Sequence, residues 1–228
     1  MFSVSLDFTV GFQGKKESVS VTLKDETNCA IIGTQGVQAS SLICQNLVCW
    51  NRDDQVRILL LNFSRSESEK FLSSDSPYLI MNTVKGDRFT KMQKWLHDEY
   101  MNRAMLLKRY GINKQKDYYS KSKDDPERPQ MPYIVLFVRN PEELPDDDLK
   151  ELISCVRVMR SEGISMVCVC DREIEKELLL CNIGCLISTE GEMSDIKPGM
   201  TKNAASQPAS AGVIPGRAVM NESLSGYM

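Results

Sequence analysis

The chain has 228 residues, which is long enough for one large α/β domain with a buried core and short for two. Its composition is ordinary for a globular protein, and a net charge of −3 gives no basic footprint, so no nucleic-acid partner is expected. No apolar run approaches the roughly 20 residues of a membrane span, and no signal peptide is recognisable. The chain could still be part of a longer, membrane-anchored protein.

The first third of the chain predicts a small hairpin followed by a strand, a turn and a helix. Alternating residues place the hairpin strands at 3–9 and 18–23, around a turn at 11–16. A buried strand is expected at 28–32 and a glycine-containing turn at 33–36, with a helix from about Ser40 to Trp50.

The middle of the chain predicts the centre of a sheet. Residues 56–63 are almost continuously apolar, as in a parallel strand that is covered on both faces. Another strand is expected over 79–84 and a long amphipathic helix from Asp87 to Tyr110. Residues 113–130 are polar and charged and contain two prolines, so we expect a mobile loop there.

The last third alternates strands and helices again. Strands are expected at 133–138, 164–170 and 183–188, helices at 146–160 and 173–180, a flexible segment at 190–212 and a final edge strand at 217–220. This order predicts a single α/β domain over 1–228, with a mostly parallel sheet that has helices on both faces. Its central strands should be 29–32, 56–62, 133–138 and 164–170.

The eight cysteines and the single histidine do not predict a metal or catalytic site. Cys181 and Cys185 are one residue too far apart for a CxxC knuckle, and no second pair with metal-ligand spacing follows. We therefore interpret the cysteines as buried thiols of a reducing cytoplasm. His97 lies on a helix without an obvious serine or cysteine partner, so it is assigned no catalytic role, and no metal site is expected.

The strand, turn and helix at 29–50 form the correct setting for a phosphate-binding loop, GxxxxGK[ST]. The segment here is GTQGVQAS, with a glutamine in place of the second glycine and an alanine in place of the lysine. We treat it as a degenerate nucleotide site, which comprises Gly33, Thr34, Gln35, Gly36, Val37, Gln38, Ala39 and Ser40.

Further segments follow in an order that resembles the FtsK/SpoIIIE-type ATPase domains, whose loop is similar to GTTGSGKS. Their strand VKFLMIDPK is matched by VRILLLN from residue 56, and their helix MERRYKLFAELGVRNIKGYN by MNRAMLLKRYGINK from residue 101. Their LPYIVVVIDEL is matched by MPYIVLFVRN from residue 131, GRAAGIHLVLATQRP by RSEGISMVCVCDRE from residue 160, and ANIPSRI by CNIGCLI from residue 181. The resemblance spans most of 25–190 and implies a RecA-like P-loop NTPase fold.

The departures from this family concern the residues that handle ATP. In the family, a Walker B aspartate holds magnesium and the following glutamate positions the attacking water. Arg139 and Asn140 stand at these two positions, and Asp171 stands where the family has a glutamine that senses the γ-phosphate. Together with Ala39, these changes predict a domain without ATPase activity, although weak ATP binding through Ser40 and the loop amides stays open. No cofactor is expected, and the parent protein would be the ATPase.

Among such families, a degenerate nucleotide site together with the lack of basic character favours a C-terminal ATPase domain of a type VII secretion motor, similar to those of EssC and EccC. The resemblance implies a cytoplasmic domain of a larger membrane protein, at the inner face of the cell membrane. Its partners would be neighbouring ATPase domains of the same chain and a secreted helical substrate or its signal peptide. The alternative is a degenerate or weakly nucleotide-binding domain of an FtsK/SpoIIIE-type DNA translocase.

Two surfaces are candidates for protein binding. Met101, Met105 and Leu106 offer flexible apolar side chains on the long helix, although residues at that spacing more often belong to a core. The other candidate is the edge around Val37 and Gln38, which a neighbouring domain could cover.

Overall fold

The computed structural model describes residues 7–13, 17–22, 28–73, 75–83, 89–122, 124–171, 183–188 and 219–222. The strands are β1 Asp7–Gln13, β2 Glu17–Thr22, β3 Asn28–Ile32, β4 Val56–Leu61, β5 Leu79–Thr83, β6 Tyr133–Arg139, β7 Ile164–Cys170, β8 Ile183–Ser188 and β9 Val219–Glu222. The α-helices are α1 Gly36–Trp50, α2 Arg65–Ser68, α3 Phe89–Arg109, α4 Tyr118–Lys121 and α5 Asp146–Val158, with 3-10 turns η1 Gln115–Asp117 and η2 Pro141–Glu143.

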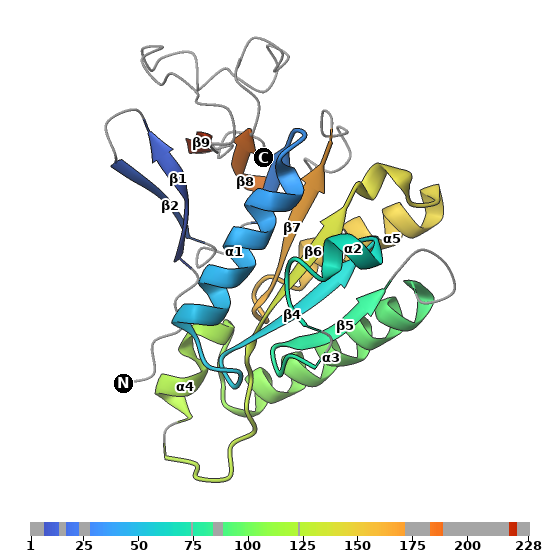
Figure 1. The fold of residues 1–228 in the computed structure, drawn as a ribbon. Coiled ribbons are helices and arrows are strands. Elements are labelled where there is room, and N and C mark those ends of the chain that lie inside the picture. Colours follow the sequence, from blue (N-terminus) through green and yellow to red (C-terminus); the bar gives the residue numbers. More distant parts are fainter. Residues whose placement is uncertain are drawn as a thin grey trace.

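Seven of the described strands form one sheet in the order β5-β4-β6-β7-β3-β8-β9 (Figure 1). All neighbouring pairs are parallel except β8 and β9, which are antiparallel at the edge. The four strands predicted to be central are contiguous in the middle of the sheet, so this prediction is confirmed. The sheet alternates with helices along the chain, which is the expected α/β architecture.

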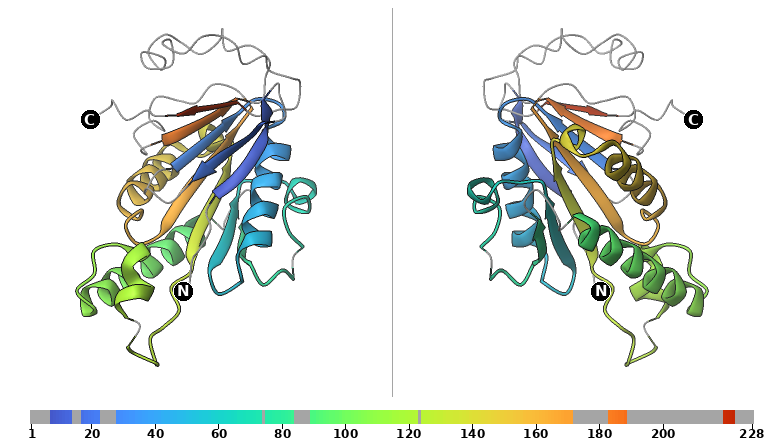
Figure 2. Two further views of the ribbon diagram at one scale, coloured as in Figure 1. Left: turned by 90° about the vertical axis from the view of Figure 1, so that its left-hand side faces the viewer. Right: turned by 90° about the vertical axis from the view of Figure 1, so that its right-hand side faces the viewer.

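The sheet separates two buried clusters of apolar side chains. Along β4 and β6, alternate residues point to opposite faces, as the two-residue period of a strand requires. Leu59 and Leu136 pack with α3 and α5 on one face, whereas Ile58 and Phe137 pack with α1 on the other. Figure 2 shows α1 on one side of the sheet and α3 with α5 on the opposite side.

The N-terminal hairpin is confirmed, with β1 and β2 antiparallel and β1 lying against α1. The first strand extends through Gly11, which the sequence had placed in the turn. The final edge strand also exists, two residues later than predicted, over Val219–Glu222. The predicted helix at 173–180 and the flexible segment at 190–212 lie outside the described residues.

The segment 113–130 differs from the loop that the sequence predicted. It contains η1 and α4, and Tyr118 is completely buried beside Leu107, Ile112 and Met131. Gln115 is buried too, and its Nε2 donates to the carbonyl of Met131 at 2.7 Å. The polar average composition of this segment predicted a loop. The prediction was wrong because a few buried residues within the segment anchor it to the domain.

Candidate functional site

Backbone hydrogen bonds, one of them to β7, hold the turn between β3 and α1. Gly33 has a φ of 114°, which side chains disfavour, and its N–H donates to the carbonyl of Cys170 at 2.9 Å. The N–H of Gly36 donates to the carbonyl of Gly33 at 2.9 Å, and α1 begins at Gly36. The predicted helix start near Ser40 is therefore wrong by four residues. Val37, Gln38 and Ala39 include no glycine or proline to interrupt a helix, so the helix extends back over them.

This early helix start limits what the turn offers to a phosphate. The N–H of Ala39 donates to the carbonyl of Gln35 at 3.0 Å, inside the first helical turn. Ser40 is completely buried, and its hydroxyl lies 2.8 Å from the carbonyl of Gly36 and 3.0 Å from that of Val37. A hydroxyl binds a metal ion through its oxygen lone pairs, and complete burial keeps this oxygen out of reach of a solvated magnesium ion. A phosphate-binding loop instead needs amides that point at the ligand and a hydroxyl that is free for magnesium.

Gly36 has a packing role that is separate from nucleotide binding. A Cβ at this position would lie 3.2 Å from Cγ1 of Val169 and 3.8 Å from Cγ2 of Ile31. The absence of a side chain allows α1 to approach β7 and β3 closely. The glycine therefore has a structural reason to be present even without a phosphate ligand.

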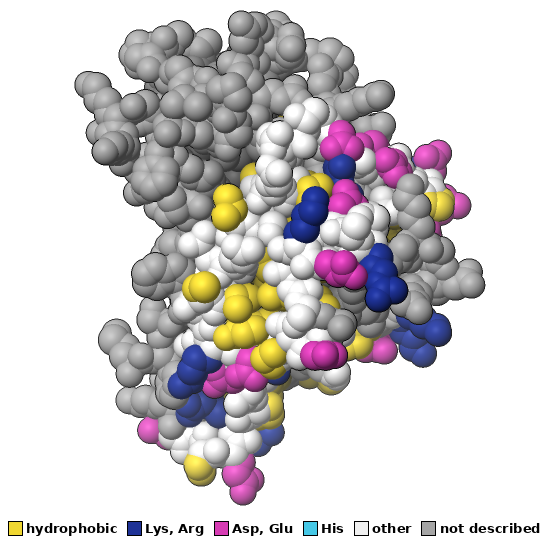
Figure 3. Space-filling view, in the orientation of Figure 1, with side chains coloured by type: hydrophobic (Ala, Val, Ile, Leu, Met, Phe, Trp, Pro, Cys, Tyr) yellow, Lys and Arg dark blue, Asp and Glu magenta, His cyan; other side chains and the backbone are white. Residues whose placement is uncertain are grey.

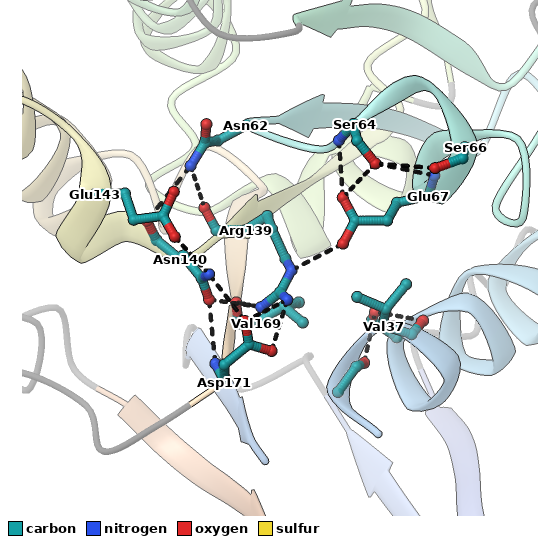
Figure 4. Close-up of polar contacts among 12 residues, drawn as sticks. Val37, Asn62, Ser64, Ser66, Glu67, Arg139, Asn140, Glu143, Val169 and Asp171 are labelled. Carbon is teal, nitrogen blue, oxygen red and sulfur yellow. Dashed lines mark hydrogen bonds and ion pairs between the residues drawn. The ribbon is translucent and has the colours of Figure 1, made fainter. Parts of the chain in front are cut away.

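Arg139, the last residue of β6, forms ion pairs with two carboxylates at the same edge of the sheet (Figure 4). Its Nη2 donates to both carboxylate oxygens of Asp171 at 2.6 Å, and its Nε donates to Oε1 of Glu67 at 3.2 Å. Its Nη1 donates to Oδ1 of Asn140 at 2.5 Å and lies 3.3 Å from the carbonyl oxygen of Val169. All three guanidinium nitrogens thus have partners, and the side chain is only 12% exposed. We call these four residues, Arg139, Asp171, Glu67 and Asn140, the Arg139 network.

Two asparagines shape the loops around the Arg139 network. Asn62 and Asn140 have φ values of 62° and 39°, in the left-handed region that asparagine tolerates better than most residues. Asn62 Nδ2 donates to the carbonyl of Arg139 at 2.8 Å. Asn140 Nδ2 donates to Glu143 at 2.9 Å and to Asp171 at 3.1 Å, while its Oδ1 accepts from the Asp171 N–H at 3.1 Å. The position at which the sequence resemblance places a catalytic glutamate is therefore occupied by an amide whose nitrogen and oxygen both form hydrogen bonds.

Glu67 is a member of the site that sequence analysis missed. It belongs to a capping box at the start of α2, in which the Ser64 N–H donates to Glu67 Oε2 at 2.8 Å and the Glu67 N–H donates to Ser64 Oγ at 3.3 Å. The S-x-x-E pattern was visible in the sequence. Its contact with Arg139 was not, because 72 residues separate the two.

The charges of the Arg139 network stabilise each other. Burial disfavours the charged guanidinium, but hydrogen bonds and attraction from Asp171 and Glu67 outweigh burial and raise the pKa of Arg139. Burial also disfavours a charged Glu67, but hydrogen bonds from Ser64 and the guanidinium of Arg139 outweigh it and lower the pKa of that carboxyl. Arg139 and Glu67 are therefore both ionised at neutral pH.

The surroundings of this edge are acidic. Glu142 and Glu143 lie on η2, and Asp146, Asp147 and Asp148 form the first turn of α5. Figure 3 shows acidic side chains gathered over the end of the molecule where η2 and α5 lie. A triphosphate placed here would approach negative charge, and Ala39 supplies no lysine to offset it.

The structure brings the predicted site residues to one edge. Arg139, Asn140 and Asp171 contact one another directly, and the turn at Gly33 reaches them through its hydrogen bond to Cys170, the residue before Asp171. This edge lies at the carboxyl ends of the parallel strands, where α/β proteins usually bind their ligands.

The cysteines are more varied than predicted. Cys29, Cys44, Cys168 and Cys170 are buried, but Cys155 is half-buried and Cys49 is exposed, so the expectation of buried thiols is wrong for Cys49. Burial raises the pKa of Cys44 to about 12. Among the side chains described, no three His, Cys, Asp or Glu residues converge in a way that could hold a metal ion. The side chains of Cys181 and Cys185 are outside this set.

The described helices also include none with the length and apolarity that crossing a membrane requires. No family model matches the sequence, and no curated protein matches it either.

Solved structures do match the fold. EssC (ATPases 2 and 3) from Geobacillus thermodenitrificans has a TM-score of 0.74 at 18% identity, over 97% of this chain and 43% of that one. The cytoplasmic domain of the type VII secretion ATPase EccC from Thermomonospora curvata has a TM-score of 0.71 at 16% identity, over 81% of this chain and 24% of that one. This chain has the fold of the type VII secretion ATPase domains.

A third match is the structure of Thermomonospora curvata EccC (ATPases 2 and 3) in complex with a signal sequence peptide. Its TM-score is 0.59 at 12% identity, over 96% of this chain and 39% of that one. At such identities the likeness concerns the fold, and this chain spans less than half the length of each of these three proteins. The type VII ATPase fold confirms the predicted RecA-like architecture.

Proposed function

We propose that this chain is a catalytically inactive ATPase-like domain of a type VII protein secretion motor, with a role in substrate recognition, assembly or regulation. The observation that carries the proposal is the position of Arg139. A guanidinium with two carboxylate partners stands at the strand end where the related motors need a magnesium-binding aspartate. A cation at this position repels the metal and also occupies the carboxylates nearby.

Two other features support inactivity. Asn140 replaces the glutamate that would orient the attacking water, and an amide cannot accept a proton in that role. Ser40 is completely buried, so the hydroxyl oxygen that would bind magnesium is not accessible from the solvent. Phosphoryl transfer depends mainly on charge and position around the phosphates, and the replacements remove both.

The test is to titrate the chain with magnesium–ATP in a calorimeter and to follow phosphate release at the same protein concentrations. We expect no heat of binding in the micromolar range and no turnover above the buffer blank. A magnesium-free titration with ATP asks separately about weak binding through the turn. A micromolar dissociation constant with magnesium, or sustained phosphate release, would overturn the proposal.

We further propose that the domain binds protein, through a neighbouring ATPase domain of the same motor or a helical secretion signal. The EccC structure with a signal sequence peptide supports such a partner. The long helix also supports it, because Met101 and Met105 are 45% and 60% exposed. The sequence-based preference for a core role is wrong for these two, whereas Leu106 is half-buried against the cluster around Tyr118. In this proposal the domain faces the cytoplasm, and only its parent protein is anchored in the membrane.

This part is tested by measuring the binding of a fluorescent helical signal peptide and of the adjacent motor domain. The variant Met101→Ser/Met105→Ser removes two exposed apolar side chains from α3, and Leu42→Ser is the matched control, because Leu42 is 52% exposed on α1. We expect the first variant to weaken binding at least several-fold and the control to leave it unchanged. If neither ligand binds and duplex DNA binds with a steep salt dependence, the domain belongs to a DNA translocase instead.

A further inference from the structure

One side chain joins the three loops that follow β4, β6 and β7. Arg139 ends β6, Glu67 lies in the segment after β4, and Asp171 directly follows β7. The guanidinium donates to oxygens in all three segments, with distances between 2.5 and 3.3 Å. In Figure 4 these side chains converge on the guanidinium from three sides.

The geometry is that of a specific contact. One nitrogen, Nη2, lies 2.6 Å from both carboxylate oxygens of Asp171, and hydrogen bonds between charged groups are about twice as strong as neutral ones. Arg139 is 12% exposed and Glu67 25%, so solvent weakens their attraction less than it would at the surface, whereas Asp171 is 44% exposed and its attraction is screened more. Glu67 is oriented independently by Ser64, and Asp171 by the hydrogen bond from Asn140 Nδ2.

Removing the guanidinium would do more than delete hydrogen bonds. Glu67 and Asp171 would remain as two carboxylates directed at one place without a counter-charge, which costs free energy. Two hydrogen bonds donated by backbone N–H groups at this edge depend on the same loops. They are the N–H of Asn140 to the carbonyl of Val169 at 2.8 Å and the N–H of Asp171 to Oδ1 of Asn140 at 3.1 Å.

We propose that Arg139 is an internal lock that holds the loops after β4, β6 and β7 in one arrangement without any bound ligand. In nucleotide-driven switches, a γ-phosphate and its magnesium order comparable loops, which relax when the phosphate leaves. Here the cation is part of the chain and cannot leave. The lock goes beyond the proposed function, because an inactive domain could equally have loops that stay loose at this edge.

The lock is tested by hydrogen exchange of single amides in the full chain. In Arg139→Met, which keeps an apolar stem, exchange at Asn140 and Asp171 should accelerate about tenfold or more relative to the unchanged protein. The amides of Tyr133 and Ile134 at the opposite end of β6, bonded to Gln55 and Gly163, should not change. Magnesium–ATP should leave the exchange of the unchanged protein as it is, and an effect there would contradict the proposed function but not the lock.

A control is provided by Arg52, which also contacts both carboxylate oxygens of one aspartate, Asp54, but on the surface and through two nitrogens, Nε at 2.9 Å and Nη2 at 2.8 Å. Arg52→Met should leave Asn140 and Asp171 unaffected. If Arg139→Met does not fold, Asp171→Asn removes the main partner instead and should accelerate exchange at Asn140 in the same local way. Acceleration that is equal at both ends of β6, or none at Asn140 in the folded variants, would overturn the lock.

Discussion

The residues that the sequence predicts at the positions of a nucleotide-binding set do not act independently, because three of them contact one another. Arg139 donates to both Asn140 and Asp171, and Asn140 donates to Asp171. A change at one position therefore alters the environment of the other two, and their effects should not add. Ala39 lies apart from them on α1 and can be changed separately.

Restoring the lysine alone should not restore catalysis. Ala39→Lys adds an ammonium group in the first turn of α1 but leaves the rest of the site unchanged. We infer that Arg139 would still repel magnesium at the neighbouring strand end. We expect phosphate release to stay at the level of the unchanged protein. The measurement is a steady-state assay with magnesium–ATP, and turnover in this single variant would show that Arg139 is not the block that we infer.

The ion pair of Glu67 should make stability depend on acid pH. The pKa of Glu67 is lowered in the folded chain, so the stability that it contributes is present above the unfolded pKa of about 4.3 and is lost as pH falls through the folded pKa. Glu67→Gln should reduce the free energy of unfolding by about 1 kcal/mol at neutral pH. This difference should vanish in strong acid, as measured by urea unfolding at several pH values.

Glu69→Gln is the control for that series, because Glu69 pairs with Arg65 on the open surface. Such pairs contribute little, so this variant should follow the unchanged protein at every pH. A deficit of Glu67→Gln that is the same at all pH values would mean that its cause is not the ionised carboxylate.

At the scale of elements, the short helices η1 and α4 connect distant parts of the domain. The N–H of Gln115 donates to the carbonyl of Ser161 at 2.7 Å, which ties this segment to the turn before β7. The Tyr118 hydroxyl donates to the carbonyl of Pro129 at 2.8 Å, and its ring packs edge-on against Tyr110 and Tyr119. The segment is thus held by buried residues in η1 and at the start of α4.

Tyr118→Ala should therefore be costly although it lies in a polar stretch of sequence. Loss of a completely buried aromatic ring destabilises a protein by about 3 kcal/mol or more. Lys116→Ala, on an exposed residue of η1, should change stability by about 0.5 kcal/mol at most. Urea unfolding measures both, and equal small effects would indicate that the segment is not anchored as described.

At the scale of the whole molecule, the two apolar clusters share the same strands. Val135 and Phe137 of β6 face α1, while Leu136 and Val138 face α3 and α5. Loss of either helical layer would expose one face of the same sheet to water. The described domain should consequently unfold as one cooperative unit.

The two tryptophans allow a direct measurement of this cooperativity. Trp50 ends α1, and Trp95 lies on α3, where it packs against the cluster on the other face of the sheet. The variants Trp50→Phe and Trp95→Phe each leave one fluorescent reporter. Their urea transitions, once corrected for any change in overall stability by circular dichroism, should coincide. Separate fluorescence and circular dichroism midpoints within either variant would contradict a single unit.

Much of the fold could be predicted from the sequence, because strands and helices leave local periodic patterns. The apolar runs at 56–63, 133–138 and 164–170 gave the central strands, and the alternation of elements gave a parallel sheet. The order of family-like motifs gave the positions of Arg139, Asn140 and Asp171 at one edge. A residue that departs from a family motif can be located in the sequence when the segments on either side of it resemble the motif.

Only the tertiary structure decided which distant groups meet. It paired Arg139 with Glu67 across 72 residues, buried Tyr118 within a polar segment, and left Met101 and Met105 exposed on a helix whose other face is buried. It also showed that α1 starts at Gly36, where close packing on β7 fixes the glycine. The physical reason is the same in each case: local patterns depend on residues within one helical turn or strand repeat, whereas pairing and burial depend on which remote segments pack there.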